Sequence, residues 1–300
     1  AEGQGGLLDV RPHPDFASNR LLYLSYAGPN SGESTTTVAR GRFENDRLDN
    51  VEVIFVAQTR GRGHYGSRLA FHPDGSLFIT VGERQAPSTG DLEAHPAQDL
   101  SNHHGTVIRL HDDGSVPDDN PFVGQVGMLP EIWSYGHRNP QGLAINSDTG
   151  DVWITEHGPQ GGDELNLIQP GMNYGWPVVG YGVNYGSGLA IHEGTQREGM
   201  ESPVHFWVPS IATSGLAFYT GDRFSEWRGN LLVGGLVGEQ VDRLTMGPDG
   251  KTVVRKETIL QGMGRVRDVR QSPDGYVYVS IEDRAGAPTS VVRLEPVDSD

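Results

Sequence analysis

The sequence lacks cysteine altogether, which excludes disulfide bonds and cysteine-ligated metals. It has no apolar run approaching the roughly 18 consecutive residues of a transmembrane helix. Long helical patterns are also missing, as are the phosphate-binding motif GxxxxGK[ST], the metalloprotease motif HExxH and the nucleophile motif GxSxG. These absences argue against membrane-spanning helices, dinucleotide-binding α/β folds, nucleotide hydrolases, zinc proteases and serine hydrolases of the α/β type.

Positive charge is scarce, because 23 lysines and arginines stand against 39 aspartates and glutamates, for a formal net charge of −16. Such an acidic chain is a poor partner for nucleic acid or for anionic membrane surfaces. The charge says nothing against a small neutral ligand. The chain opens on a polar, glycine-rich stretch over residues 1–6, in which no signal peptide is visible.

The sequence does contain a recurring unit, in which a polar turn rich in Pro, Asp and Gly precedes a short alternating apolar run. The unit occurs five times, at intervals of roughly 45–80 residues, over 13–27, 72–83, 146–158, 221–235 and 272–283. Such runs indicate strands, and further strand-like runs lie over 35–43, 51–58, 105–111 and 290–296. We predict one all-β propeller domain over residues 1–300. An all-β sandwich is the alternative, although sandwiches show no such regular repeat.

Long loops are expected between the strands at 84–104 and 177–205, and loops on one rim of a rigid scaffold are where a site is expected. Among the histidines, His13 and His72 hold the same place in two repeats, so a structural role in the turn is the simpler interpretation. His64 lies outside that place and could act as a general base near neutral pH. Taken alone, the residue favours the simpler interpretation that His64 is a satisfied or exposed loop histidine.

The segment GHRNPQG at 136–142 gathers Arg138, Asn139 and Gln141 around a proline, which interrupts regular strand pairing. Three hydrogen-bonding side chains in such a loop could hold a planar, oxygen-rich ligand. They could equally bond to the backbone of their own loop. The residues alone favour neither interpretation.

The segment EHGPQGGDELN at 156–166 leaves backbone carbonyl groups free, because few of its residues can pair in a ladder. Calcium accepts carbonyl oxygens as well as carboxylates. A Ca²⁺ site would use the carbonyl oxygens of Gly158 and Pro159, with Asp163 nearby. The spacing does not match an EF-hand loop, and a tight turn with solvated acidic side chains is the alternative.

Arg265 and Arg267 lie two residues apart on a predicted strand, so both side chains are expected on one face. Two guanidinium groups on one face suit a ligand with several carboxylates. In a chain this acidic, pairing with Asp or Glu is the alternative that the residues favour.

Taken together, these segments resemble the soluble aldose and glucose dehydrogenases that depend on pyrroloquinoline quinone (PQQ). The resemblance spans nearly the whole chain in the family's order, through GQGGLLDVRPHPDF, GHYGSRLAFHPDG, IWSYGHRNPQGLA, TEHGPQGGDELNLIQPGMNYGWP and RVRDV. The succession of GHRNPQGLA, EHGP, GGDELN and NYGWP is highly specific. The resemblance implies a six-bladed propeller with PQQ in a central depression of its rim.

The resemblance also implies roles for single residues. His64 is the implied catalytic base, and Arg138 the implied catalytic group that stabilises negative charge on the quinone. The implied cofactor-binding residues are Gln4, Arg138, Asn139, Gln141, Arg265 and Arg267, and the implied Ca²⁺ ligands are the carbonyl groups of Gly158 and Pro159. The implied reaction oxidises an aldose sugar at C1 to a lactone by hydride transfer to PQQ, and an external acceptor then takes the electrons. The implied protein is a periplasmic or secreted monomer.

The chain departs from the glucose dehydrogenase branch at two places. Val237 stands where that branch has a lysine that contacts the cofactor, and Gly63 stands where it has an aspartate. Both changes fit the broader aldose branch, so broad sugar specificity is expected. Five repeats are present rather than six, so we also expect the first blade to be missing or incomplete, with the first and last strands near each other across a gap.

Two other functions remain open. A Ca²⁺-dependent propeller hydrolase, such as a lactonase, would need several carboxylate or Asn side chains converging on the metal, whereas the candidate ligands here are mainly carbonyl groups. A propeller without enzymatic activity that binds a glycan or a protein partner would be favoured by loss of His64 or of the arginines, and all of these are present.

Overall fold

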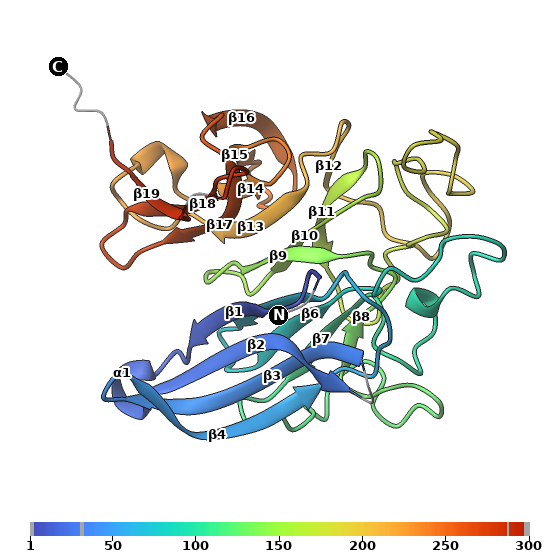
Figure 1. Ribbon diagram of the computed structural model, residues 1–300, viewed down its shortest axis with the longest axis horizontal. Helices are drawn as coiled ribbons and strands as arrows, with labels where there is room; N and C mark the ends of the chain where they lie inside the picture. The colour runs from blue at the N-terminus through green and yellow to red at the C-terminus, as the bar shows by residue number, and fades with distance from the viewer. Residues whose placement is uncertain (1–2, 31–32, 287, 297–300) are drawn as a thin grey trace.

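The computed structural model describes residues 3–30, 33–286 and 288–296, whose strands form five antiparallel sheets around an axis (Figure 1). The first sheet contains β1 (Leu7–Pro12), β2 (Leu21–Asn30), β3 (Glu33–Glu44) and β4 (Arg47–Val56). The second contains β5 (Gly66–Phe71), β6 (Leu77–Val81), β7 (Thr106–Leu110) and β8 (Ile132–Ser134). The third contains β9 (Pro140–Ile145), β10 (Val152–Glu156), β11 (Asp163–Ile168) and β12 (His205–Trp207).

The fourth sheet contains β13 (Thr213–Phe218), β14 (Leu231–Gly235), β15 (Gln240–Met246) and β16 (Val253–Gln261). The fifth contains β17 (Arg265–Gln271), β18 (Val277–Glu282) and β19 (Ser290–Leu294). The described helices are short: α1 (Phe16–Asn19) and the 3₁₀ helices η1 (Pro96–Gln98) and η2 (Ser225–Trp227). None of the helices in these parts of the chain is long and apolar enough to cross a membrane.

Each sequence repeat supplies the turn and the second strand of one sheet, so the predicted all-β propeller is confirmed with five blades. The predicted role of the two repeat histidines in the turn is confirmed as well. His13 Nδ1 accepts a hydrogen bond from the backbone N–H of Asp15 at 2.9 Å. His72 Nδ1 accepts the equivalent bond from Asp74 at 3.2 Å.

The core lies between consecutive sheets, because successive side chains of a strand point to opposite faces. In β14, Leu231 and Val233 pack in a cluster with Trp153 of the third sheet. Leu232, between them in the chain, packs instead with Val277 of the fifth sheet. Both faces of an inner blade are therefore buried, which explains why its second strand reads as an almost continuous apolar run.

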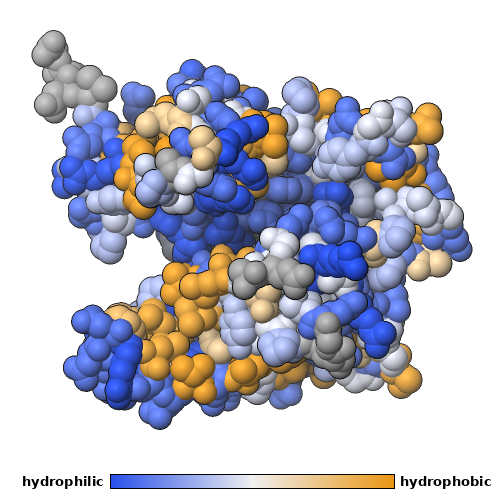
Figure 2. All heavy atoms as spheres, in the orientation of Figure 1, coloured by the Kyte–Doolittle hydropathy of each residue, from blue (hydrophilic) through white to orange (hydrophobic). Residues whose placement is uncertain are grey.

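The fifth and first sheets do not pack in this way. Figure 2 shows a notch between them, with apolar residues on the wall formed by β1 and β2, where Val10 is 47% exposed. Near the axis the two sheets approach through an ion pair between Arg270 Nη2 and Asp9 Oδ1 at 2.7 Å. The first sheet has four strands, whereas the fifth has three described strands. A six-bladed ring whose first blade is missing or incomplete stays a prediction.

Candidate active site

A pocket of about 420 Å³ opens on the rim where the innermost strands β1, β5 and β9 begin. Four residues predicted from the sequence line it: Gln4, His64, Arg138 and Pro159. The predicted long loops also contribute to its wall, through residues 85–88 and 184–185. Residues from segments far apart in the chain therefore converge on one depression.

His64 is paired with a carboxylate that the sequence interpretation did not single out. Glu83 is 2% exposed, and its two oxygens lie 2.7 and 2.9 Å from His64 Nδ1. The same carboxylate accepts the backbone N–H of Gln85 at 2.7 Å. A carboxylate at Nδ1 fixes the proton on that nitrogen and leaves the lone pair on Nε2. This is the tautomer that a general base needs.

The backbone around His64 is held in an unusual conformation. His64 has a φ of 45°, in the left-handed region that non-glycine residues seldom adopt. Its N–H donates to Gln4 Oε1 at 2.8 Å, and its carbonyl oxygen packs so closely on Gly82 that a β-carbon there would lie 2.1 Å away. Gly82 therefore has to be glycine, and Gln4 positions the backbone of His64.

A buried arginine holds the loop before His64 from the other side. Arg84 is 1% exposed, and its Nη2 donates to the carbonyl groups of Gly61 at 2.7 Å and Ser34 at 2.8 Å, while Nη1 donates to that of Gly63. Its guanidinium lies 3.6 Å from the centre of the Tyr65 ring. In the described part of the chain no carboxylate pairs with it, so its charge is balanced only by carbonyl dipoles and the ring face.

Replacing Arg84 by methionine should therefore destabilise the fold. Three carbonyl groups, one buried and two partly buried, would lose their donor, and we expect the free energy of unfolding to fall by about 3 kcal/mol. Urea denaturation measures this change. Arg62→Met, an exposed arginine on the same loop, is the matched control and should leave stability within about 0.5 kcal/mol of the parent. Equal unfolding curves for the two variants would contradict the assignment.

Arg138 connects the loop before β9 with the loop after β10. Its Nη1 donates to the carbonyl oxygens of Gly158 at 2.9 Å and His157 at 3.2 Å. The guanidinium lies 5.1 Å from the centre of the Trp176 ring, within cation–π range. Its Nε is buried and finds no hydrogen-bond partner among the described residues. The side chain thus lines the pocket with donor capacity to spare.

Asn139 and Gln141 are placed differently from Arg138, because neither lines the pocket. Asn139 is 3% exposed, and its Oδ1 accepts hydrogen bonds from the backbone N–H of Gly66 at 3.1 Å and from Gln141 Nε2 at 3.2 Å. Both therefore bond within the protein, but neither of these bonds goes to the backbone of their own loop, which was the alternative interpretation of GHRNPQG. Their contact with a cofactor stays a prediction.

Arg265 and Arg267 are held by an acidic side chain, the alternative that the residues favoured. Arg265 Nε lies 3.6 Å from Glu282 Oε2, and Arg267 donates to the same oxygen through Nε at 2.5 Å. Both arginines lie at the start of β17, and their shared partner places both on one face, as predicted. Neither lines the His64 pocket, so their binding of a cofactor stays a prediction.

Three glutamates that contact basic residues of the candidate site occupy equivalent positions in their blades, and the sequence interpretation missed this. Glu83, Glu156 and Glu282 each come at or just after the end of the second strand of a blade. Each contacts a basic residue at or just before the start of the innermost strand of the same blade. In the third sheet, Glu156 accepts the backbone N–H of Arg138 at 2.6 Å, and its other oxygen lies 2.9 Å from His137 Nδ1. The signal was available, because an acidic residue ends the apolar run in three of the five repeats.

The loop after Glu156 presents oxygen atoms to a small space beside the pocket. A β-carbon on Gly158 would lie 2.2–2.3 Å from the carbonyl oxygens of Gly162 and Gly161, so these groups crowd around one point. Burial, and then the charge of Glu156, raise the pKa of Glu164 well above its usual value. Burial likewise lowers the pKa of His157, which lines both spaces. The described residues contain no group of three or more His, Asp or Glu side chains that could hold a metal ion, so a Ca²⁺ site at these carbonyl groups stays a prediction.

The fold and the site together define a β-propeller with a rim pocket that holds a histidine–carboxylate pair and a neighbouring arginine. The glucose / sorbosone dehydrogenase family model matches residues 1–293, and the chain belongs to this family.

Individual relatives agree. Aldose sugar dehydrogenase YliI of Escherichia coli is 43% identical over 294 residues, covering 95% of this chain and 76% of the relative. A crystal structure of a glucose dehydrogenase, 45% identical, superposes with a TM-score of 0.91 over 99% of this chain and 84% of the other. The PQQ-bound form of the Streptomyces coelicolor aldose sugar dehydrogenase, 28% identical, superposes with a TM-score of 0.77 over 98% of this chain and 81% of the other.

Proposed function

We propose that this protein is a quinoprotein dehydrogenase that oxidises aldose sugars of broad range at C1, releasing lactones and passing electrons to an external acceptor. The observation that carries the proposal is the buried pair of His64 and Glu83 at the edge of a rim pocket that Arg138 also lines. The PQQ-bound relative supports the choice of cofactor. A periplasmic or secreted location and a monomeric state remain part of the proposal.

The residues present suit such a cofactor. PQQ, when bound, would supply the acceptor for the hydride that leaves C1 of the sugar. Arg138 would hold an oxygen of the quinone with its spare donors, and the carbonyl groups of Gly158 and Pro159 would hold Ca²⁺ beside it. Arg265 and Arg267 would have to exchange part of their contact with Glu282 for carboxylates of the cofactor.

His64 would take the proton of the sugar C1 hydroxyl group at Nε2. Glu83 keeps Nδ1 protonated and stabilises the positive charge that the ring gains in this step. The pocket walls from Trp176 and the 84–104 and 177–205 loops would hold the sugar ring against His64. The residues of this chain would thus bind and orient the sugar, and His64 would remove one proton from it.

Reconstitution tests the proposal. The protein incubated with PQQ and Ca²⁺ should reduce an artificial electron-accepting dye when an aldose is added, and the quinone absorbance should change when sugar is added without dye. A C1-methyl glycoside of the same sugar is the matched control, because it has no C1 hydroxyl proton to lose. Absence of dye reduction and of any absorbance change, in a protein shown to be folded, would rule out the proposed reaction.

A further inference from the structure

A second cavity lies at the opposite end of the propeller axis, where the innermost strands end. Its volume is about 410 Å³, within the range of roughly 300–1,000 Å³ that is usual for small-molecule sites. The last residues of β1, β5, β9, β13 and β17 all contribute to its wall. The cavity is therefore centred on the axis, and it shares no lining residue with the His64 pocket.

The wall of this axial cavity is mostly apolar and carries positive charge at one side. Its apolar residues include Phe71, Ile145 and Phe218, which end three successive innermost strands. Its two charged residues are Arg11 and Arg270, and no carboxylate is among the described residues that line it. An apolar wall with convergent cationic donors suits an anion that carries an apolar body.

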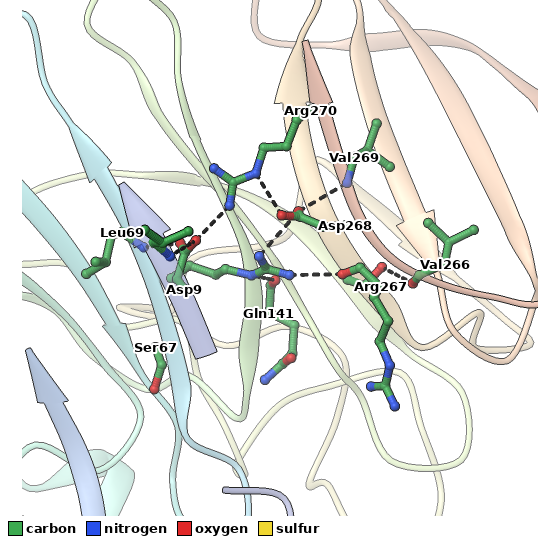
Figure 3. A network of polar contacts seen from close by, with 12 residues as sticks. Asp9, Ser67, Leu69, Gln141, Val266, Arg267, Asp268, Val269 and Arg270 are labelled. Carbon is green, nitrogen blue, oxygen red and sulfur yellow. Dashed lines mark hydrogen bonds and ion pairs between the residues drawn. The ribbon is translucent and has the colours of Figure 1, made fainter. Parts of the chain in front are cut away.

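Arg270, one of the residues that line the cavity, belongs to a network of ion pairs with Asp9 and Asp268 (Figure 3). Arg270 bridges two carboxylates, with Nη2 2.7 Å from Asp9 and Nε 2.7 Å from Asp268. Arg68 Nη1 lies 3.2 Å from Asp268, and its other nitrogens donate to two backbone carbonyl groups. Together with Arg11, the cluster holds three cations and two anions.

Among the described residues, Arg11 has the longest ion pair of this cluster. Its Nε donates to the carbonyl oxygen of Leu69 at 2.8 Å, and the nearest carboxylate oxygen, on Asp9, is 3.9 Å away. That oxygen already accepts the backbone N–H of Leu69 at 2.9 Å. Burial, and then the neighbouring charge of Arg270, lower the pKa of Arg11 to about 10. The side chain therefore remains a cation at neutral pH, although its surroundings disfavour the charge.

We propose that the axial cavity binds a carboxylate with a compact apolar body, whose charged end pairs with Arg11 and whose apolar end packs on Phe71, Ile145 and Phe218. A carboxylate can accept two parallel hydrogen bonds from one guanidinium, which is a closer contact than the 3.9 Å between Arg11 and Asp9. The site lies at the opposite end of the axis from His64, so it is independent of the cofactor and of the proposed dehydrogenase reaction.

Binding of 4-fluorobenzoate, followed by fluorine NMR, tests this site. We expect saturable binding to the parent protein, and Arg11→Gln should weaken it by roughly ten- to a hundredfold. Arg11→Lys keeps the charge and should retain part of the affinity. Arg138→Gln, in the rim pocket, should leave the binding unchanged. The neutral isostere 4-fluorobenzyl alcohol should bind at least tenfold more weakly than the acid.

Nuclear Overhauser contacts provide a second measurement that needs no variant. Contacts from the ligand ring to the side chains of Phe71 and Ile145 are expected. Contacts to Trp176 instead, or loss of binding in Arg138→Gln with no loss in Arg11→Gln, would place the ligand in the rim pocket and overturn the proposal. Absence of saturable binding to the parent protein, or equal affinity for acid and alcohol, would overturn it as well.

Discussion

Replacing His64 by alanine should lower sugar oxidation by the reconstituted protein by roughly 10²- to 10⁴-fold, the range that a positioned general base contributes. The pair with Glu83 would be lost, and no other described imidazole in the pocket has a carboxylate at Nδ1. His157 lines the same pocket, but its Nε2 lies 2.6 Å from the carbonyl oxygen of Thr213 and burial lowers its pKa. Steady-state rates with saturating sugar and dye measure the effect.

The matched control is His72→Ala, which removes a histidine from a repeat turn outside the pocket and should leave the rate within twofold. Titration of the quinone absorbance should show that His64→Ala still binds PQQ, because His64 contributes a base and no charge to the cofactor. A fall in cofactor binding that matches the fall in rate would argue for a role of His64 in binding instead. Unchanged turnover would remove His64 from the mechanism.

Replacing Arg138 by methionine should lower turnover by roughly 10²- to 10³-fold, as expected when a preorganised donor to a developing anion is removed. Two effects combine in this variant. The pocket loses a cation, and the carbonyl oxygens of Gly158 and His157 lose the donor that holds the loop in place. Arg138→Lys restores the charge without the forked donors, so it should recover only part of the rate.

Arg109→Met is the matched control, because Arg109 is also buried and lies 4.9 Å from the centre of a tryptophan ring, that of Trp133. It pairs with Asp74 and Asp119 away from the pocket. Both variants lose similar packing, so a thermal melt should show similar destabilisation, while only Arg138→Met should lose turnover at a temperature where both are folded. Equal rates in the two variants would refute a catalytic role for Arg138.

The repeat pattern made the architecture predictable. A turn such as HPDG at 72–75 followed by a short apolar run is typical of a buried strand, and both faces of an inner blade are covered by its neighbours. Five repeats thus yielded five blades. The notch between the first and last sheets could be expected from the repeat count, whereas the ion pair of Asp9 with Arg270 near the axis could not, because it joins residues 261 apart in the chain.

The site was less predictable than the fold. His64 could be separated from His13 and His72 because it breaks the repeat, and Arg138 because it belongs to a distinctive segment. Glu83 and Arg84 were missed, because residues that directly follow a strand of a repeat are usually interpreted as structural. Whether an arginine such as Arg267 faces a ligand or a carboxylate depends on the chain's folded path, which residue types and spacing do not specify.

The rim pocket and the axial cavity share no lining residue, and the ion cluster of Arg68, Asp268 and Arg270 includes one residue of the axial cavity wall. A propeller with an open axis could admit one reactant at each end. In the proposed reaction, sugar, lactone and electron acceptor would all approach the His64 pocket from the rim. The electron acceptor could then approach the reduced cofactor only after the lactone has left, so sugar oxidation and cofactor reoxidation would alternate. Sugar bound in the pocket at high concentration would compete with the acceptor and slow the reoxidation of the cofactor.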